Sequence, residues 1–225
     1  ILIGLVGSEM CIRDRFMTVL ALLLSVPFGV GAAIYLVEYA KKGNKLVGII
    51  RVTAETLSGI PSIIYGLFGM LFFVTALKWG YSMMAGAATL AIMVLPVIMR
   101  TTEEALLCVP DSFREGSFGL GAGKLRTIFK IVLPSAIPGI LSGIILAIGR
   151  IVGETAALIY TSGTVANLAG FFDSGRTLAI HMYSLSREGM HTNEAYATAV
   201  VLLIVVLIIN GVSSLIAKKF EAPKQ

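Results

Sequence analysis

Residues 16–37 read FMTVLALLLSVPFGVGAAIYLV, a run of 22 residues without a charged side chain. Four more uncharged runs follow at 56–77, 79–99, 131–149 and 195–217, and together the five runs hold 107 of the 225 residues. A helix needs about 20 apolar residues to cross a bilayer core about 30 Å thick. The runs therefore predict five membrane-spanning helices in an all-α protein.

The overall composition agrees with a polytopic membrane protein. Apolar residues make up 56% of the chain and charged residues 14%, and the mean hydropathy is +0.89. Soluble domains are usually about 45–50% apolar and about a quarter charged. Two cysteines, Cys11 and Cys108, are too few for a disulfide framework. A cytosolic enzyme, a disordered chain and a secreted disulfide scaffold are thus excluded.

Lysine and arginine are divided unevenly between the two sides of the membrane. Segments 40–55, 100–134 and 218–225 carry 12 of them, and the segments on the other side carry five. The positive-inside rule then places the first group, including the tail from 218, in the cytoplasm. This distribution also explains the net charge of +5 without a nucleic-acid partner. The uncharged stretch 155–172 is interpreted as the end of a helix and part of an external loop, 161–194.

The first 15 residues do not match the chain that follows. Gly7–Arg15 is polar and lacks helical periodicity, and Leu5–Arg15 resembles a translated sequencing adapter. A genuine external loop is the alternative. We assign no function to 1–15, expect the natural N-terminus to be missing, and treat 16–217 as a single transmembrane domain.

The longest cytoplasmic segment, 100–134, carries several helix signals. The acidic stretch TTEE at 101–104 predicts a helix start, and Pro110 ends that helix and begins another. Three glycines within 119–123 predict a turn before a further helix from 124. Ordered loops of about 30 residues are uncommon without a role, which favours a docking element over an ordinary solvated loop.

The glycine-rich stretch GLGAGK at 119–124 invites comparison with a phosphate-binding P-loop, and it fails that comparison. Phe118 stands where the first glycine is required, and Leu125 stands where serine or threonine should follow the lysine. The sequence thus predicts no nucleotide site in this chain, and ATP-driven work would need a partner.

The same loop resembles the EAA loop of ABC-importer permeases, the MetI-like inner membrane components of binding-protein-dependent transport. Glu115 is followed by five residues, Gly121, nine residues and the sequence IVLP at 131–134. In that family a short helix in this loop binds a groove on a cytoplasmic ATPase. The two alanines of the motif are Gly116 and Ser117 here, and glycine lowers helix propensity by about 1 kcal/mol. The resemblance implies a coupling loop formed by Glu115, Gly116, Ser117, Gly121, Ala122 and Lys124.

Three further stretches resemble the PstA family of phosphate-importer permeases: RTTEEAL at 100–106, GIPSIIYGLFG at 59–69 and GETA at 153–156. The similarity extends from about Phe16 to Ala217. It implies a MetI-like type I permease fold with six transmembrane helices in the family, of which this chain holds five. It also implies a bacterial cell membrane location.

The resemblance implies a set of partners as well. These are a second, PstC-like permease subunit, two PstB-like ATPase subunits, and an external PstS-like binding protein that delivers phosphate. ATP and Mg²⁺ belong to the ATPase, and no cofactor is expected in this chain.

Arg150 and Glu154 are charged residues within an otherwise apolar stretch. Residues four apart share one face of a helix. A charge near the bilayer centre costs at least about 2.5–3.5 kcal/mol, so such groups usually face a protein interior and are paired. The arginine fork suits a tetrahedral oxyanion, and Glu154 could hold Arg150 when the anion leaves. We therefore predict a translocation role, which the resemblance also implies, and a purely structural ion pair is the alternative.

Other polar residues give weaker signals. Arg176 and Arg187 are possible anion contacts in the external loop, although solvated loop charges explain them better. His181 and His191 lack neighbours at metal-ligand spacing, so no metal site is expected. Pro61 between Gly59 and Ser62 predicts a broken helix beside the path.

Two rival functions remain open. The EAA pattern does not separate phosphate from other oxyanions such as molybdate or sulfate. An intramembrane enzyme could use Glu154 as a general base on a lipid phosphate. The sequence offers no nucleophile–base pair or metal cluster to support such an enzyme, so a transporter subunit is expected.

Overall fold

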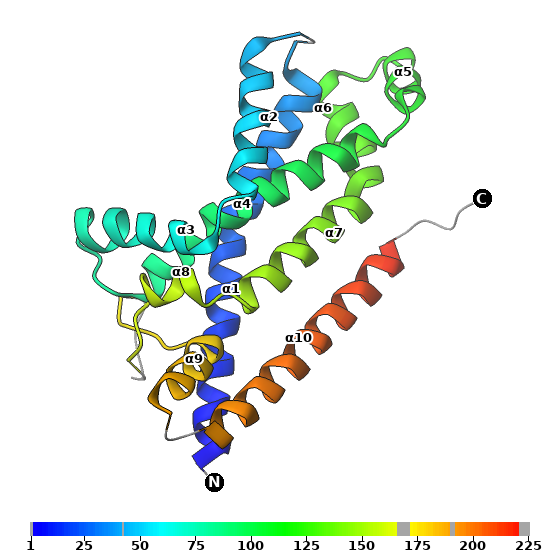
Figure 1. The fold of residues 1–225 in the computed structure, drawn as a ribbon. Helices are drawn as coiled ribbons and strands as arrows, with labels where there is room; N and C mark the ends of the chain where they lie inside the picture. The colour runs from blue at the N-terminus through cyan, green and yellow to red at the C-terminus, as the bar shows by residue number, and fades with distance from the viewer. Residues whose placement is uncertain (1, 42, 166–171, 190–191, 221–225) are drawn as a thin grey trace.

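The structure, a computed structural model, describes residues 2–41, 43–165, 172–189 and 192–220, which are almost entirely helical (Figure 1). The α-helices are α1 (Leu2–Ile34), α2 (Lys45–Ser58), α3 (Ser62–Gly69), α4 (Met83–Leu107), α5 (Asp111–Gly119), α6 (Lys124–Thr127), α7 (Leu133–Val152), α8 (Ala156–Ile159), α9 (Leu178–Glu188) and α10 (Thr192–Phe220). Three π-helical segments continue them: η1 (Tyr35–Tyr39), η2 (Met70–Ala76) and η3 (Ile128–Val132). The all-α prediction is confirmed.

Four helices are long and apolar enough to cross a membrane: Ile12–Tyr39, Met83–Leu107, Lys124–Val152 and Thr192–Val212. A fifth span is formed if α2 and the segment Ser62–Ala76 are taken together, and these two are bent by 101° at their junction. The predicted number of five spans therefore holds, with one span broken.

The break occurs where the sequence predicts it, at Gly59 to Pro61. Pro61 lacks an N–H and has extended ψ, so the backbone turns before α3 begins at Ser62. The predicted span 56–77, however, begins earlier and is not straight, because Asn44 starts a separate helix at Lys45 by accepting a hydrogen bond from the N–H of Leu46. α3 lies across the bundle rather than along it (Figure 1).

α4 is the centre of the fold. It packs against α1 on one side and α7 on the other, and α10 contacts α7 and α9 (Figure 1). In the most apolar 18-residue stretch of α4, 72% of the residues are buried inside the fold, whereas in the corresponding stretch of α10 only 6% are buried. Met93, Val94 and Ile98 of α4 are completely buried in the core. α10 thus leaves most of its apolar surface facing outward.

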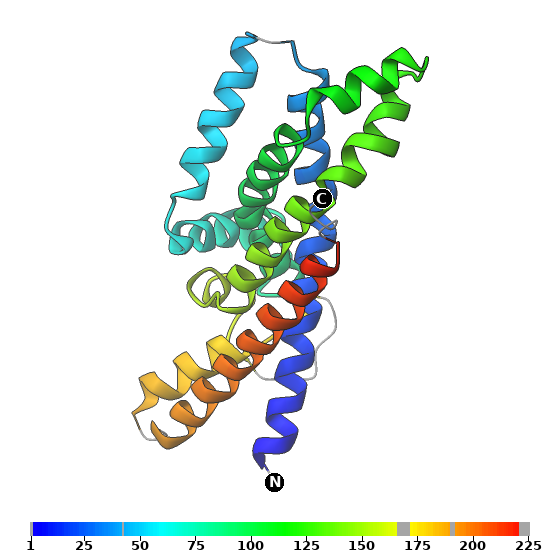
Figure 2. The ribbon, with the colours of Figure 1, turned by 90° about the vertical axis from the view of Figure 1, so that its right-hand side faces the viewer.

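The two ends of the molecule separate the charged segments as the loop charges predict. Figure 2 shows α2 and α5 at one end, whereas α9 and the N-terminus lie at the other. Which end faces the cytoplasm stays a prediction. The segment 161–194, which is predicted to be external, contains the helix α9. The stretch 155–172 forms no span among its described residues, but the expectation that it holds the end of the preceding helix is wrong, because α7 ends at Val152 and Ala156–Ile159 forms the separate helix α8.

The helix start expected at 101–104 is wrong. α4 continues without interruption from Met83 to Leu107, so these residues lie in its last turns. Their acidic side chains do not mark an N-terminus because arginines hold them: Glu103 lies 2.5 Å from Arg51, and Glu104 lies 3.2 Å from Arg100. The predicted end of this helix before Pro110 is confirmed.

Residues 5–15 continue the helix α1. The carboxylate of Asp14 accepts a hydrogen bond from the N–H of Leu178, at the start of α9. At the other end of the chain, α10 extends through Phe220, and the rest of the expected tail lies outside the described residues.

Glycine allows α3 to approach α8 closely. A Cβ at Gly66 would lie 2.8 Å from the Cα of Ala157 and 3.1 Å from its carbonyl oxygen. The obstacle is backbone, which cannot rotate away. We therefore expect Gly66→Ala to lower the unfolding free energy by about 1–3 kcal/mol, measured as a lower melting temperature in detergent.

Gly31→Ala is the matched control, because nothing lies within 4 Å of the Cβ it would add. It should leave the melting temperature unchanged or slightly raised, since alanine favours a helix over glycine. Equal melting temperatures for the two variants would contradict the close packing of α3 on α8.

Candidate functional site

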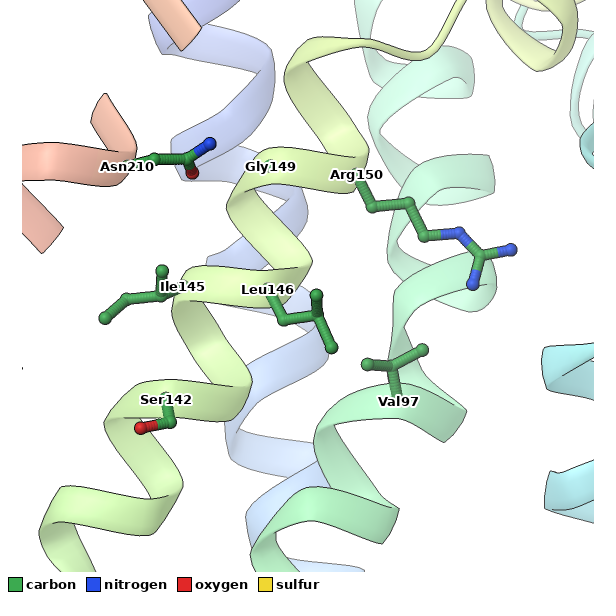
Figure 3. A pocket seen from close by; sticks show the side chains of 7 residues that line it. All are labelled: Val97, Ser142, Ile145, Leu146, Gly149, Arg150 and Asn210. Atoms are coloured by element: carbon green, nitrogen blue, oxygen red, sulfur yellow. The ribbon is translucent and has the colours of Figure 1, made fainter. Parts of the chain in front are cut away.

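Arg150 lies in the last turn of α7 and lines an open groove of about 640 Å³ on the surface of the bundle. The groove is lined by Val97, Ser142, Ile145, Leu146, Gly149, Arg150 and Asn210 (Figure 3). In Figure 3 the side chain of Arg150 extends past Val97 of α4, while Asn210 of α10 lies on the other side of α7. Three helices that can span the membrane therefore meet at this groove.

Arg150 has no neutralising partner in the part of the chain that the structure describes: no hydrogen bond or ion pair joins it to those residues. Its positive charge acts electrostatically on the hydroxyl of Tyr65 in α3. That hydroxyl donates a 2.7 Å hydrogen bond to the carbonyl oxygen of Leu57, at the break between α2 and α3. The groove thus presents an uncompensated cation beside the broken span.

Glu154 does not share a helix face with Arg150, so that expectation is wrong. α7 ends at Val152, Gly153 follows, and Glu154 lies outside the helix. Its carboxylate instead accepts a 3.1 Å hydrogen bond from the N–H of Ala157, in the first turn of α8. Gly153 is the sequence signal that could have placed this end, since glycine commonly follows the last turn of a helix.

The two arginines that are predicted to be external differ in their surroundings. The guanidinium of Arg176 donates to the carbonyl oxygen of Thr164 at 2.7 Å and to the hydroxyl of Ser184 at 3.3 Å. It therefore ties the loop to α9. Arg187 is exposed and lies over the ring of Tyr183. Neither arginine lines the groove, and their role as anion contacts stays a prediction.

No group of three potential metal ligands occurs among the described residues. His181 lies 3.2 Å from a guanidinium nitrogen of Arg176, which is a poor neighbour for a metal ligand. His191 lies outside the described residues.

The loop between α4 and α7 forms the predicted helix, glycine turn and helix. Pro110 precedes α5, Gly121 adopts a positive φ of 79°, and Lys124 begins α6. The second helix is longer than expected, because α6, η3 and α7 form one continuous apolar span from Lys124 to Val152. Ser117 is buried, and its hydroxyl lies 2.9 Å from that of Thr127, which joins the two arms of the loop. Glu115, Gly116 and Gly121 are exposed.

Apolar side chains gather on the outer surface of this loop. Leu120, at the tip, is 91% exposed. The other exposed apolar residues of the loop are Phe113, Phe118, Leu125 and Phe129. The loop lies at the end of the molecule, beyond the bundle (Figures 1 and 2). An apolar patch in such a position is typical of a protein-docking surface.

Sequence reasoning missed the ionic contacts that hold this end together. Arg114 of α5 binds Glu38 of η1 at 2.8 Å. In a second cluster, Arg51 of α2 binds Glu103 beside a groove of about 270 Å³ between α2 and α4. No local spacing signals either pair, because the partners lie far apart in the sequence.

The amino-acid sequence matches a family described as "Binding-protein-dependent transport system inner membrane component" over residues 25–222. It is 37% identical to the probable ABC transporter permease protein YqgI of Bacillus subtilis, over 94% of this chain and 80% of that protein. It is 38% identical to the phosphate transport system permease protein PstA 1 of Mycobacterium tuberculosis H37Rv, over 87% of this chain and 64% of that protein. For PstA of Yersinia pestis the identity is 37%, over 88% and 68%.

Solved structures show the same fold. The inward-facing MetNI methionine ABC transporter superimposes with a TM-score of 0.80 at 19% identity, covering 98% of both chains. A bacterial ABC transporter for import of the acidic polysaccharide alginate superimposes with a TM-score of 0.70 at 14% identity, covering 93% of this chain and 78% of the other.

The hydrogen bond of Glu154 and the isolation of Arg150 predict different effects on stability. Glu154→Ala removes an acceptor at the start of α8, so we expect it to lower the unfolding free energy by about 1 kcal/mol. Glu154→Gln keeps an acceptor oxygen and should lower it less. Arg150→Gln removes no hydrogen bond or ion pair to a described residue and should stay within about 0.5 kcal/mol of the native chain.

Thermal unfolding in detergent measures all three variants. A loss in Arg150→Gln as large as that in Glu154→Ala would show that Arg150 is a structural residue rather than an unpartnered one.

Proposed function

The chain belongs to the family of binding-protein-dependent transport inner membrane components and is a permease subunit of an ABC importer; from this premise we propose that it moves inorganic phosphate across the bacterial cytoplasmic membrane. As an importer permease it works with an ATPase, a second permease subunit and a substrate-binding protein. The finer assignment is that these partners are PstB-like, PstC-like and PstS-like.

Arg150 carries the proposal. It places a permanent positive charge in a groove between spans, where no described residue neutralises it. The planar guanidinium matches the oxygens of a tetrahedral oxyanion through paired hydrogen bonds. Retaining such a charge in a membrane is costly, and intramembrane charges usually mark ion or substrate pathways. Relatives named as phosphate permeases favour phosphate among the oxyanions.

The position of Glu154 changes how the anion would be released. An exchange in which Glu154 replaces phosphate on Arg150 requires α7 to extend or Glu154 to leave the N–H of Ala157. The broken span offers another polar neighbour, since the Tyr65 hydroxyl is within electrostatic reach of Arg150.

The glycine turn supports the assignment of ATP and Mg²⁺ to a partner. The ammonium group of Lys124 lies over the ring of Tyr39 at 4.8 Å and so does not face the turn as a P-loop lysine would. The exposed apolar residues around Leu120 form the surface on which the ATPase docks. ATP binding then moves α5, and the permease alternates between outward and inward access.

Uptake of radiolabelled phosphate tests the proposal. Cells without their own phosphate importer would express the full-length subunit together with its permease, ATPase and binding-protein partners. We expect ATP-dependent uptake that Arg150→Gln lowers at least tenfold and Arg150→Lys lowers less, because lysine keeps the charge without the fork.

An excess of sulfate or molybdate should leave this uptake unchanged. Competition by either anion would reassign the substrate to another oxyanion while keeping the permease. Native uptake in the Arg150→Gln variant would show that Arg150 does not take part in phosphate translocation.

A substitution at the loop tip tests ATPase docking separately. Burying a leucine contributes about 1.5–3 kcal/mol, so Leu120→Asp should weaken ATPase association at least tenfold. Co-purification of the ATPase with the tagged permease measures this. Tyr183→Asp, on α9 at the opposite end, is the control and should retain the ATPase. Equal retention by both variants would contradict docking at the tip.

A further inference from the structure

α5 contacts the membrane spans through two inward-facing side chains, Ser117 and the charged Arg114. The side chain of Arg114 is 15% exposed, whereas Asp111 on the same helix is 82% exposed and Glu115 is also exposed. Arg114 thus faces inward, while the apolar docking residues of α5 face outward. A movement imposed on the outer face of α5 reaches the bundle through this inner contact.

Arg114 closes the end of α4. Its guanidinium donates to the carbonyl oxygens of Leu106 at 3.0 Å and Val109 at 2.8 Å. The last carbonyls of a helix lack partners within the helix, and a positive charge is favourable at this end. α4 and α5 are therefore held together by hydrogen bonds from a charged donor.

The same guanidinium binds Glu38 through two nitrogens. Nε and Nη2 donate to Oε1 of Glu38 at 3.0 and 2.8 Å, and the carboxylate is 8% exposed. Glu38 lies in η1, the π-helical end of α1. No other ion pair reaches it from the described residues. A buried carboxylate in this position depends on its arginine, because removing one partner leaves an uncompensated charge.

The other arm of the loop also contacts η1. Lys124 lies over the ring of Tyr39, next to Glu38 in the chain. The hydroxyls of Ser117 and Thr127 join the two arms to each other. The loop therefore contacts the end of α1 twice, once through Arg114 and once through Lys124.

α1 and α4 then carry the movement to the groove. They pack against each other along their lengths, and Val97 of α4 lines the groove beside Arg150. We infer that Glu38 in η1 receives the movement of α5 through the positioning residue Arg114, so that this pair couples ATP-driven motion of the loop to the groove. The inference rests on the proposed docking of the ATPase to α5.

The test uses the assembled complex in lipid vesicles and compares phosphate moved with ATP hydrolysed. Glu38→Gln and Arg114→Gln each remove half of the pair. The double variant Glu38→Met/Arg114→Met removes both charges and fills the space with apolar side chains, which avoids a buried unpaired charge. We expect each variant to retain the ATPase and its hydrolysis, while phosphate moved per ATP falls at least fivefold.

Asp111→Asn is the matched control. Asp111 contacts the same arginine at 3.1 Å but is exposed, so its variant should keep the native ratio. A folded double variant that keeps both the ATPase and the native ratio would overturn the inference. So would an equal loss of coupling in Asp111→Asn, because the effect would then not depend on the buried pair.

A second readout needs no transported substrate and separates this inference from the proposed function. Spin labels at exposed Ser112 in α5 and exposed Tyr35 in η1 report the distance between the loop and the end of α1. In the native complex this distance should stay constant when ATP binds, because the two move together. In the double variant it should change.

A distance that changes in the native complex, or stays constant in the double variant, would refute the inference that Arg114 and Glu38 couple α5 to α1. Absence of phosphate uptake by the native complex would refute only the proposed substrate. The distance measurement does not need phosphate and would still test the role of Arg114 and Glu38.

Discussion

Hydrocarbon offers no hydrogen-bond partner to a peptide group, and this constraint shapes the whole chain. Every backbone group within the membrane must be satisfied by the protein itself, which leaves helices as the available structure for these spans. The break between α2 and α3 obeys the same constraint. The carbonyl oxygen of Leu57, freed at the end of α2, accepts hydrogen bonds from the Tyr65 hydroxyl and from the N–H of Ile60. An irregular segment is thus tolerated because the fold satisfies it.

The pairing of charged side chains follows from the same constraint, and it distinguishes structural charges from the one that is available to a ligand. Glu38 and Arg114 neutralise each other in a buried contact, and Glu103 is held by Arg51. Arg150 differs, since no described residue pairs with it although it lines a groove between spans. A charge that the fold leaves uncompensated is available to a ligand, whereas a paired charge transmits force or fixes position.

Much of the fold follows from local sequence. The uncharged runs identify the spans because burial in lipid depends directly on the length and polarity of a segment. Pro61, Pro110 and Gly121 mark the break and the loop because each restricts or frees the backbone at its own position.

Contacts between distant residues could not be found in this way. Arg114 and Glu38 are 76 positions apart, and no periodic pattern relates them. The helical register of Glu154 was missed for a more local reason, since one glycine ended α7 two residues before it. The acidic stretch at 101–104 misled because its charges are compensated by arginines that only the tertiary structure brings close. Sequence patterns therefore locate the Arg150 region and the docking loop, and the structure decides which charges remain available.

The exposed apolar tip of the loop also affects how long the subunit persists in the cell before it assembles with an ATPase. Leu120 and its aromatic neighbours face water in the isolated chain, and such surfaces attract chaperones, proteases and other unassembled chains. A permease made in excess would therefore be removed rather than stored, and the supply of the ATPase would set how many subunits persist. With the ATPase docking proposed above, this apolar surface would also adjust the number of permease subunits to the number of ATPase subunits.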